Sequence, residues 1–122
     1  MFFTFDNNLP IYIQLVQQLK INIISGRLKP LERLPSVREL AMQTKVNPNT
    51  MQKALAELEE TGLIFTERTN GKFVTADTAL IARYRQEYAE EMAKAFLEQM
   101  AQVGFDREQC VQYLQEVSQS SS

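Results

Sequence analysis

Hydrogen-bonding side chains gather at the start of one predicted helix, where they could contact nucleic acid. The dipeptide Asn47-Pro48 combines an asparagine N-cap with proline at the first helical position, which is a typical helix start. The polar residues that follow in the first turns are Asn49, Thr50, Gln52 and Lys53. Short polar side chains can read base edges and a lysine can bind phosphate, so this helix start is a candidate DNA-reading surface.

The residue types that support catalysis or metal binding are scarce in this chain. Its 122 residues contain no histidine, which removes the commonest general base and the commonest metal ligand. The adjacent carboxylates Glu59-Glu60 and Glu90-Glu91 have no base or nucleophile beside them and are interpreted as helix-face charges. We therefore predict no catalytic residue, no metal site, no cofactor and no enzyme activity. The single cysteine, Cys110, excludes an intramolecular disulfide and is interpreted as a buried apolar residue.

Two helix start signals define the element that positions the polar residues. Ser36 followed by Glu39 forms an S-x-x-E capping box, which predicts a helix over about 36–43. Asn47 then starts a second helix over about 48–61, after a short turn. The apolar residues of these two helices are spaced to bury one face; they are Val37, Leu40, Ala41, Met51, Ala54, Leu55 and Leu58. A short helix, a tight turn and a longer helix predict a helix-turn-helix.

Elements on either side of this pair complete a winged helix. An amphipathic helix begins after Pro10 and ends at Ser25-Gly26. Its apolar stripe consists of Tyr12, Leu15, Val16, Leu19 and Ile23. Two β-prone runs, 63–66 and 72–75, flank Asn70-Gly71, which predicts a hairpin closed by a type I′ turn with positive φ at both central residues. A helix-turn-helix followed at once by such a hairpin is a winged helix.

The last part of the chain shows the pattern of two amphipathic helices, over about 77–103 and 107–118. The apolar stripe of the first is Ile81, Tyr84, Tyr88, Met92, Ala95, Phe96 and Met100, and that of the second is Cys110, Val111, Leu114 and Val117. The long stripe could pack on the winged helix, pack on another chain or line a ligand cavity. Dimerisation is favoured because so small a domain offers the helix little surface to cover. The predicted dimer contacts are Ile81, Tyr84, Tyr88, Met92, Phe96, Val111 and Leu114.

The predicted fold is therefore mainly α with a small β-hairpin. A winged helix-turn-helix domain over 1–76 precedes a C-terminal two-helix dimerisation segment over 77–122. Residues 1–75 carry 9 basic and 7 acidic side chains, a net charge of +2, whereas residues 76–122 carry 4 and 8, a net of −4. This split explains how a chain of net charge −2 can present a locally basic face to DNA.

Nothing in the sequence is typical of a membrane or secreted protein. No apolar run approaches the roughly 18 residues that a membrane span needs. The N-terminal residues lack the basic region typical of a signal peptide. We expect a cytoplasmic protein with no membrane partner, and no motif indicates a small-molecule effector, although one remains possible.

Several blocks of sequence resemble the DNA-binding domain of the GntR family of bacterial transcription regulators. They are P-I-Y-x-Q at 10–14, S-G-R-L-K-P at 25–30, R-L-P-S-V-R-E-L-A at 33–41, V-N-P-N-T at 46–50, A-L-x-E-L-E at 54–59 and G-L-I at 62–64. The resemblance covers about residues 9–75. The short acidic remainder resembles the YtrA subfamily, which lacks the large effector domains of other branches.

The resemblance implies DNA contacts by Arg38, by the start of the recognition helix and by the wing. With the neighbouring basic and polar residues, the candidate DNA-binding set is Arg33, Ser36, Arg38, Asn47, Asn49, Thr50, Lys53, Asn70, Gly71 and Lys72. Arg38 could instead pair with a carboxylate such as Glu39 or Glu57, and Asn47 could serve only as a cap. This chain has Leu31-Glu32 where family members often have Gly-Asp, and Arg68-Thr69-Asn70-Gly71 where the wing commonly reads R-G-x-G.

We predict a homodimeric transcription regulator, a repressor, that binds a palindromic operator in double-stranded DNA. The YtrA resemblance implies control of a neighbouring transporter operon. The alternative from another class is a winged helix that binds protein, which would suit the acidic second half and the sequence pI of about 5.2.

Overall fold

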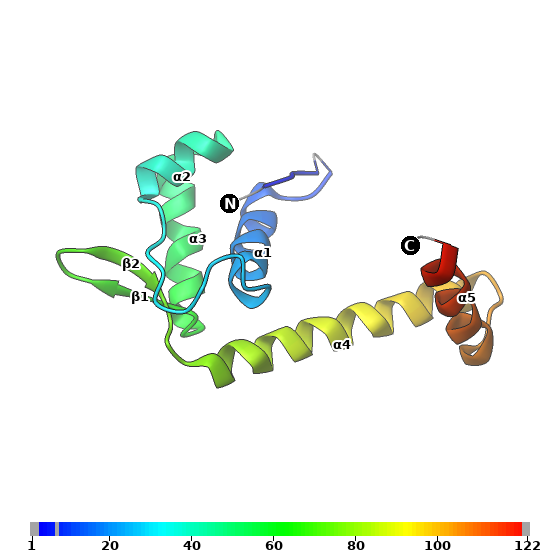
Figure 1. Cartoon of the computed structure of the whole chain (residues 1–122). Coiled ribbons are helices and arrows are strands. Elements are labelled where there is room, and N and C mark those ends of the chain that lie inside the picture. The colour runs from blue at the N-terminus through cyan, green and yellow to red at the C-terminus, as the bar shows by residue number, and fades with distance from the viewer. Residues whose placement is uncertain (1–2, 7, 121–122) are drawn as a thin grey trace. The chain divides into compact units, whose positions relative to one another are not determined.

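Helices and one hairpin follow each other along the chain in the predicted order (Figure 1). The computed structural model describes residues 3–6 and 8–120. Within these ranges the elements are α1 (Ile11–Ile24), α2 (Val37–Thr44), α3 (Pro48–Glu60), β1 (Ile64–Glu67), β2 (Gly71–Val74), α4 (Thr78–Gln102) and α5 (Arg107–Ser120). This arrangement confirms the predicted fold class, a winged helix with two further C-terminal helices.

The chain divides into one compact unit that ends at Arg85 and a second that begins at Gln86. The first unit thus runs past residue 76, the predicted end of the winged helix, into the first turns of α4. The side chains explain this extension, because the Nζ of Lys20 in α1 lies 4.5 Å from the ring centroid of Tyr84 in α4. A cation over an aromatic face is a favourable contact.

The start of the helix-turn-helix forms as its sequence signals indicate. Ser36 Oγ accepts a hydrogen bond from the backbone N–H of Glu39 at 3.1 Å, and the Glu39 carboxylate accepts one from the backbone N–H of Ser36 at 3.3 Å. Asn47 Oδ1 accepts from the backbone N–H of Asn49 at 2.8 Å, with Pro48 at the first position of α3. Lys45 adopts φ 58° at the end of α2, so the chain reverses there and enters α3.

The core of the first unit lies where α1, α2, α3 and the hairpin meet. Its buried apolar side chains are Leu15, Leu19, Ile23, Ile24, Leu28, Leu34, Leu40, Ala41, Met51, Ala54, Leu55, Leu58, Leu63, Ile64 and Val74. Fully burying one leucine stabilises the fold by about 1.5–3 kcal/mol. The α1 stripe differs from the prediction at two positions: Tyr12 and Val16 are half-buried, whereas the polar Gln14 and Asn22 are buried.

Gln14 is buried because it holds the N-terminal arm on α1. Its side-chain amide accepts from the backbone N–H of Asp6 and donates to the Asp6 carbonyl, both at 2.6 Å. One turn further along, Gln18 accepts from the backbone N–H of Thr4 at 2.8 Å and donates to the carbonyl of the same residue. Residues four apart lie on one helix face, so the two glutamines together tie the arm down.

The wing is an antiparallel hairpin in which Ile64 pairs with Val74 and Glu67 pairs with Gly71. The predicted type I′ turn is wrong. The loop contains residues 68–70, none of which has positive φ, and Asn70 N donates to the Glu67 carbonyl at 3.3 Å. Positive φ occurs instead at Gly71, the first residue of β2, at 98°. A type I turn followed by a left-handed glycine needs positive φ at one position, so Asn70 stays in the ordinary region.

A third segment of backbone pairs with the outer side of β2. Leu34 N donates to the Lys72 carbonyl at 2.8 Å, Leu31 N donates to the Val74 carbonyl at 2.9 Å, and Arg33 forms a bridge with Phe73. This pairing links the wing to the chain entering α2. Leu31 adopts φ 67°, the left-handed conformation that glycine favours and that a leucine adopts at a cost. The position is one of the two where the family would often have Gly-Asp.

The second unit consists of the rest of α4 and α5. Gly104, with φ 94°, ends α4, and Asp106 and Gln109 form a reciprocal cap at the start of α5, with distances of 2.9 and 3.0 Å. Phe105 and Tyr113 pack edge to face, with ring centroids 5.1 Å apart. Cys110 is 1% exposed and is the buried residue of the described range 86–120. None of the helices in the described ranges combines the length and apolarity that crossing a membrane requires.

Candidate nucleic-acid interface

The start of α3 exposes polar side chains on one face and buries apolar side chains on the other. Met51, Ala54 and Leu55 are buried and hold the helix on the core, whereas Asn49 and Lys53 are exposed and Thr50 is half-buried. Asn49 and Lys53 are exposed because residues four apart lie on the same face of a helix, here the face opposite the buried residues. No side-chain hydrogen bond or ion pair within the described residues engages Asn49 or Lys53, so both remain available for an external partner.

Arg38 is in the first turn of α2 and is exposed. In the part of the chain that the structure describes, it forms no ion pair with Glu39 or Glu57, the carboxylates considered as alternative partners. Glu39 accepts the capping hydrogen bond from Ser36 instead. A planar guanidinium with this freedom can donate two parallel hydrogen bonds to guanine or to a phosphate.

Three other residues of the predicted DNA-binding set use their polar side-chain atoms in hydrogen bonds within the chain. The Ser36 hydroxyl and the Asn47 side-chain oxygen accept the capping bonds of α2 and α3. Asn70 Nδ2 donates to a carboxylate oxygen of Glu67 at 3.1 Å. These residues shape the helix starts and the wing loop, and their capacity for external contacts is smaller than that of Arg38 or Asn49.

A groove of about 270 Å³ separates the wing from the start of α2. It is lined by Arg33, Leu34, Pro35, Ser36, Val37, Thr66, Glu67, Arg68, Thr69, Asn70, Gly71 and Lys72. The groove therefore brings together five of the six predicted residues that lie outside α2 and α3, namely Arg33, Ser36, Asn70, Gly71 and Lys72; the sixth, Asn47, does not line it. Arg68 also lines the groove, although it was not in the predicted set. Its position as a basic residue in the predicted wing loop was the sequence signal that could have identified it.

Arg33 lies against the glycine at the wing. A Cβ added to Gly71 would be 3.3 Å from Nε of Arg33, and the φ of 98° at Gly71 is strained for any other residue. The positive φ favours glycine at this position, and a Cβ here would require the Arg33 side chain to shift slightly. The close approach sets the Arg33 guanidinium beside the wing loop.

Lys72 is engaged inside the first unit. Its Nζ lies 3.3 Å from Glu59 Oε1 and 2.8 Å from Thr66 Oγ1, and Thr66 Oγ1 donates to the same Glu59 oxygen at 2.5 Å. The hydrogen bond from Thr66 and the charge of Lys72 hold the pKa of the Glu59 carboxyl below its ordinary value, although partial burial acts in the opposite direction. Lys72 thus differs from the exposed Lys53, which has no such partner among residues 3–6 and 8–120.

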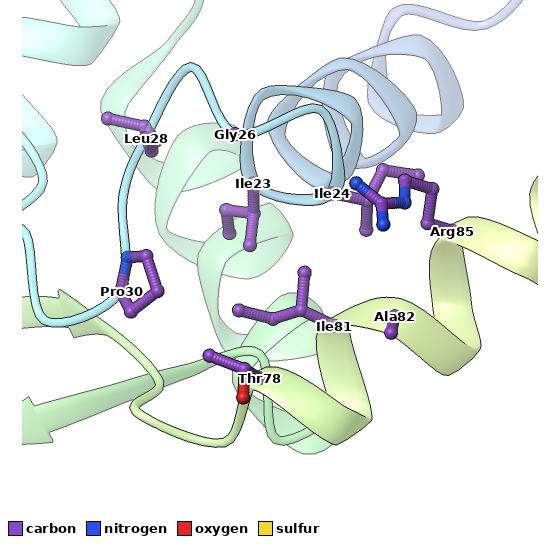
Figure 2. Close-up of a pocket in the computed structure, with 9 residues that line it drawn as sticks. All are labelled: Ile23, Ile24, Gly26, Leu28, Pro30, Thr78, Ile81, Ala82 and Arg85. Carbon is purple, nitrogen blue, oxygen red and sulfur yellow. The ribbon is translucent and has the colours of Figure 1, made fainter.

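The predicted dimer contacts fall into two groups. Ile81 and Tyr84 belong to the first unit: Tyr84 lies under Lys20, and Ile81 faces Ile23 and Ile24 across a cavity of about 200 Å³ (Figure 2). The intrachain packing considered as an alternative thus holds for these two. In the second unit Tyr88 and Phe96 are half-buried, while Met92, Val111 and Leu114 are 58%, 48% and 52% exposed.

Comparison with known proteins agrees with this geometry. The model of the bacterial regulatory proteins of the gntR family matches residues 11–74, from the start of α1 to the end of β2. YhcF, an HTH-type transcriptional regulator of Bacillus subtilis, is 34% identical over 88% of this chain and 89% of its own length. The HTH-type transcriptional repressor YtrA of Bacillus subtilis is 37% identical over 89% of this chain and 85% of its own length.

Solved structures show the same fold. A GntR family transcriptional regulator from Listeria monocytogenes is 37% identical, with a TM-score of 0.86 over 92% of this chain and 98% of that one. The DNA-binding domain of AraR, in complex with operator ORE1, is 27% identical, with a TM-score of 0.53 over 62% of this chain and 94% of that one.

Proposed function

This chain belongs to the gntR family of bacterial regulatory proteins, which are helix-turn-helix DNA-binding regulators, and we propose that it is a homodimeric repressor of a palindromic operator. The observation that carries the proposal is the exposed polar start of α3 on a winged helix that matches the family from α1 to β2. The YtrA repressor has the same length class, since this chain covers 85% of it.

The first step of the proposed mechanism is docking of α3 in a major groove. Asn49 would read a base edge, because an asparagine amide can make two hydrogen bonds to adenine. Lys53, one turn along on the same face, would bind phosphate, and Arg38 would reach guanine or the backbone from the start of α2. Thr50 would add a contact from the flank of α3.

The wing would approach the neighbouring minor groove. Arg33 and Arg68 line the groove beside Gly71, so they are the arginines that could enter the minor groove with the wing. A narrow minor groove attracts arginine through its negative potential. Ser36, Asn47 and Asn70 would act chiefly by fixing the backbone that presents these side chains.

The second unit would join two copies of the chain. Its apolar faces are covered poorly within the unit, as the exposure of Met92, Val111 and Leu114 shows. Together with Tyr88 and Phe96 they would form a self-complementary surface, which suits a two-fold dimer. The functional division would then be residues 1–76 for DNA and 77–122 for dimerisation, with Ile81 and Tyr84 at the junction.

Two-fold symmetry requires a palindromic operator with half-sites about one helical turn apart. Occupancy of that operator would block transcription, in keeping with the repressor function that the name of the YtrA relative states. We propose further that the regulated genes include a neighbouring transporter operon, as the sequence resemblance to the YtrA subfamily implies.

A mobility-shift titration tests the proposal. The probe is duplex DNA carrying the palindrome upstream of the gene, and the control is the same duplex with one half-site scrambled. We expect specific binding to the intact palindrome, with an affinity that falls steeply with salt because counterions are released from contacted phosphates. Equal, weak binding to both duplexes would favour the alternative, a winged helix that binds protein.

A further inference from the structure

We infer that Glu59, Thr66 and Lys72 form a brace that positions the wing against the recognition helix, and that Lys72 acts through this brace and not on DNA. The inference deepens the proposed function and rests on it. It reassigns one residue of the predicted DNA-binding set and adds two that the set did not contain.

The brace joins both strands of the wing to one atom of α3. Thr66 in β1 and Lys72 in β2 are cross-strand partners. Thr66 Oγ1 donates to Glu59 Oε1 at 2.5 Å, and Lys72 Nζ lies 3.3 Å from the same oxygen and 2.8 Å from Thr66 Oγ1. The three groups close a triangle, so each one fixes the other two.

The location of the triangle makes it a positioning device. Glu59 is in the last turn of α3, and the pair Thr66–Lys72 is next to Glu67–Gly71, the last pair before the wing loop. On the other strand edge, Leu34 N donates to the Lys72 carbonyl. Lys72 is thus held by its backbone from the α2 side and by its side chain from the α3 side.

The direction in which DNA affinity changes when Glu59 is removed tests the role assigned to it. Removing a carboxylate close to DNA ordinarily strengthens binding, because it relieves repulsion from phosphates. Removing Glu59 should instead weaken binding, because the wing loses its attachment to α3. The neighbouring Glu60 has the same charge and is exposed, and it forms no ion pair in the described part of the chain, so Glu60→Ala is the matched control.

The experiment compares Glu59→Ala, Thr66→Val and Lys72→Gln with the Glu60→Ala control. In the free protein, we expect hydrogen exchange of the wing amides 66–73 to become faster in the three brace variants and to stay unchanged in the control. A solvent-accessible, half-buried pair of this type contributes up to about 1 kcal/mol, which corresponds to a change of up to about 5-fold. Unchanged exchange in Glu59→Ala and Thr66→Val would overturn the brace.

The DNA measurement uses the palindromic duplex at several salt concentrations. The three brace variants should each bind about 2- to 5-fold more weakly, the Glu59→Ala/Lys72→Gln double variant should be no weaker than either single one, and the salt slope should not change. Tighter binding by Glu59→Ala, or a salt slope lowered by about one phosphate contact in Lys72→Gln, would overturn the inference. Failure of the wild-type protein to bind the duplex would count against the proposed function, while the exchange result still decides whether the brace exists.

Discussion

The two compact units of this chain treat their apolar residues in opposite ways. Among the residues that the structure describes, the first unit buries fifteen apolar side chains, from Leu15 to Val74, whereas in the second Cys110 alone is buried. In the second unit Met92, Val103, Val111 and Leu114 stay about half or more exposed. Apolar area removed from water is the main source of stability, so burial stabilises the first unit more than the second. The exposed apolar side chains of the second unit support the proposed dimer.

Charge divides along a similar line. The net charge is +2 over residues 1–75 and −4 over residues 76–122. Under the proposed function, DNA would repel the acidic C-terminal part, and the winged helix would make the contact. If the proposed function holds, composition separates the two proposed tasks: DNA binding belongs to a unit with a core and a basic face, and dimerisation to one with an apolar face and acidic flanks.

The same truncation in the two units should have very different effects on stability, which is the largest difference we expect. Leu58→Ala, in the core of the first unit, should lower the free energy of unfolding by about 2–5 kcal/mol, because it leaves a cavity. Leu114→Ala, at 52% exposure in α5, should cost below about 1 kcal/mol when the protein is dilute enough to be monomeric. Urea unfolding followed by circular dichroism measures the free energy of unfolding of both variants. Equal losses of stability in the two variants would contradict the proposed difference between the units.

A charge placed on the exposed face of the second unit should separate assembly from folding. Leu114→Glu should convert the protein to monomer in light scattering and weaken operator binding about 100-fold, because the two half-sites are no longer engaged together. The control is Gln115→Glu, the same charge on the adjacent exposed residue of α5. A Leu114→Glu protein that remained dimeric would remove α5 from the interface, and Tyr88→Glu would then test α4 in the same way.

Loss of a base-reading side chain should act on the first unit alone. Asn49→Ala should weaken binding to the intact palindrome about 10-fold, within the roughly 1–3 kcal/mol expected for one bidentate base contact, without changing the dimer. Gln17→Ala, which removes an exposed amide from α1, is the matched control and should bind normally. Normal binding by Asn49→Ala would exclude it from the reading surface.

The smallest effect should come from relieving the backbone at Leu31. Leu31→Gly should stabilise the first unit by up to about 1 kcal/mol, because leucine at φ 67° is strained and its side chain is 59% exposed. Met42→Gly removes a similarly exposed side chain from within α2 and should destabilise by about 1 kcal/mol. Opposite signs for the two variants in urea unfolding would confirm the strain; a loss of stability in Leu31→Gly would refute it.

Local signals in the sequence predicted the helix starts and the order of the elements. Ser36 with Glu39, and Asn47 with Pro48, form the caps that their spacing indicates, because capping depends only on residues within one turn. Asn70-Gly71 predicted the hairpin but not its turn type. The position of the turn depends on cross-strand register, and the register set by the Glu67–Gly71 pair leaves a three-residue loop.

Contacts between residues far apart in the chain could not be predicted from the sequence. The engagement of Lys72 by Glu59, thirteen positions away, and the packing of Tyr84 under Lys20 arise from tertiary packing. A lysine beside a wing looks the same in sequence whether it pairs with a carboxylate or with phosphate. The candidate contacts on α2 and α3 stay predictions, since exposure makes Arg38, Asn49 and Lys53 available without showing what they bind.

The hydrogen bonds that hold the N-terminal arm on α1 depend on the helix being formed. Gln14 and Gln18 can hold Asp6 and Thr4 only when both amides project from one face, a condition that a coil does not meet. We therefore expect α1 to form before the arm docks on it. In a refolding experiment, protection of the Thr4 and Asp6 amides should lag behind that of α1 itself, so these two amides would report on the completion of a helix to which they do not belong.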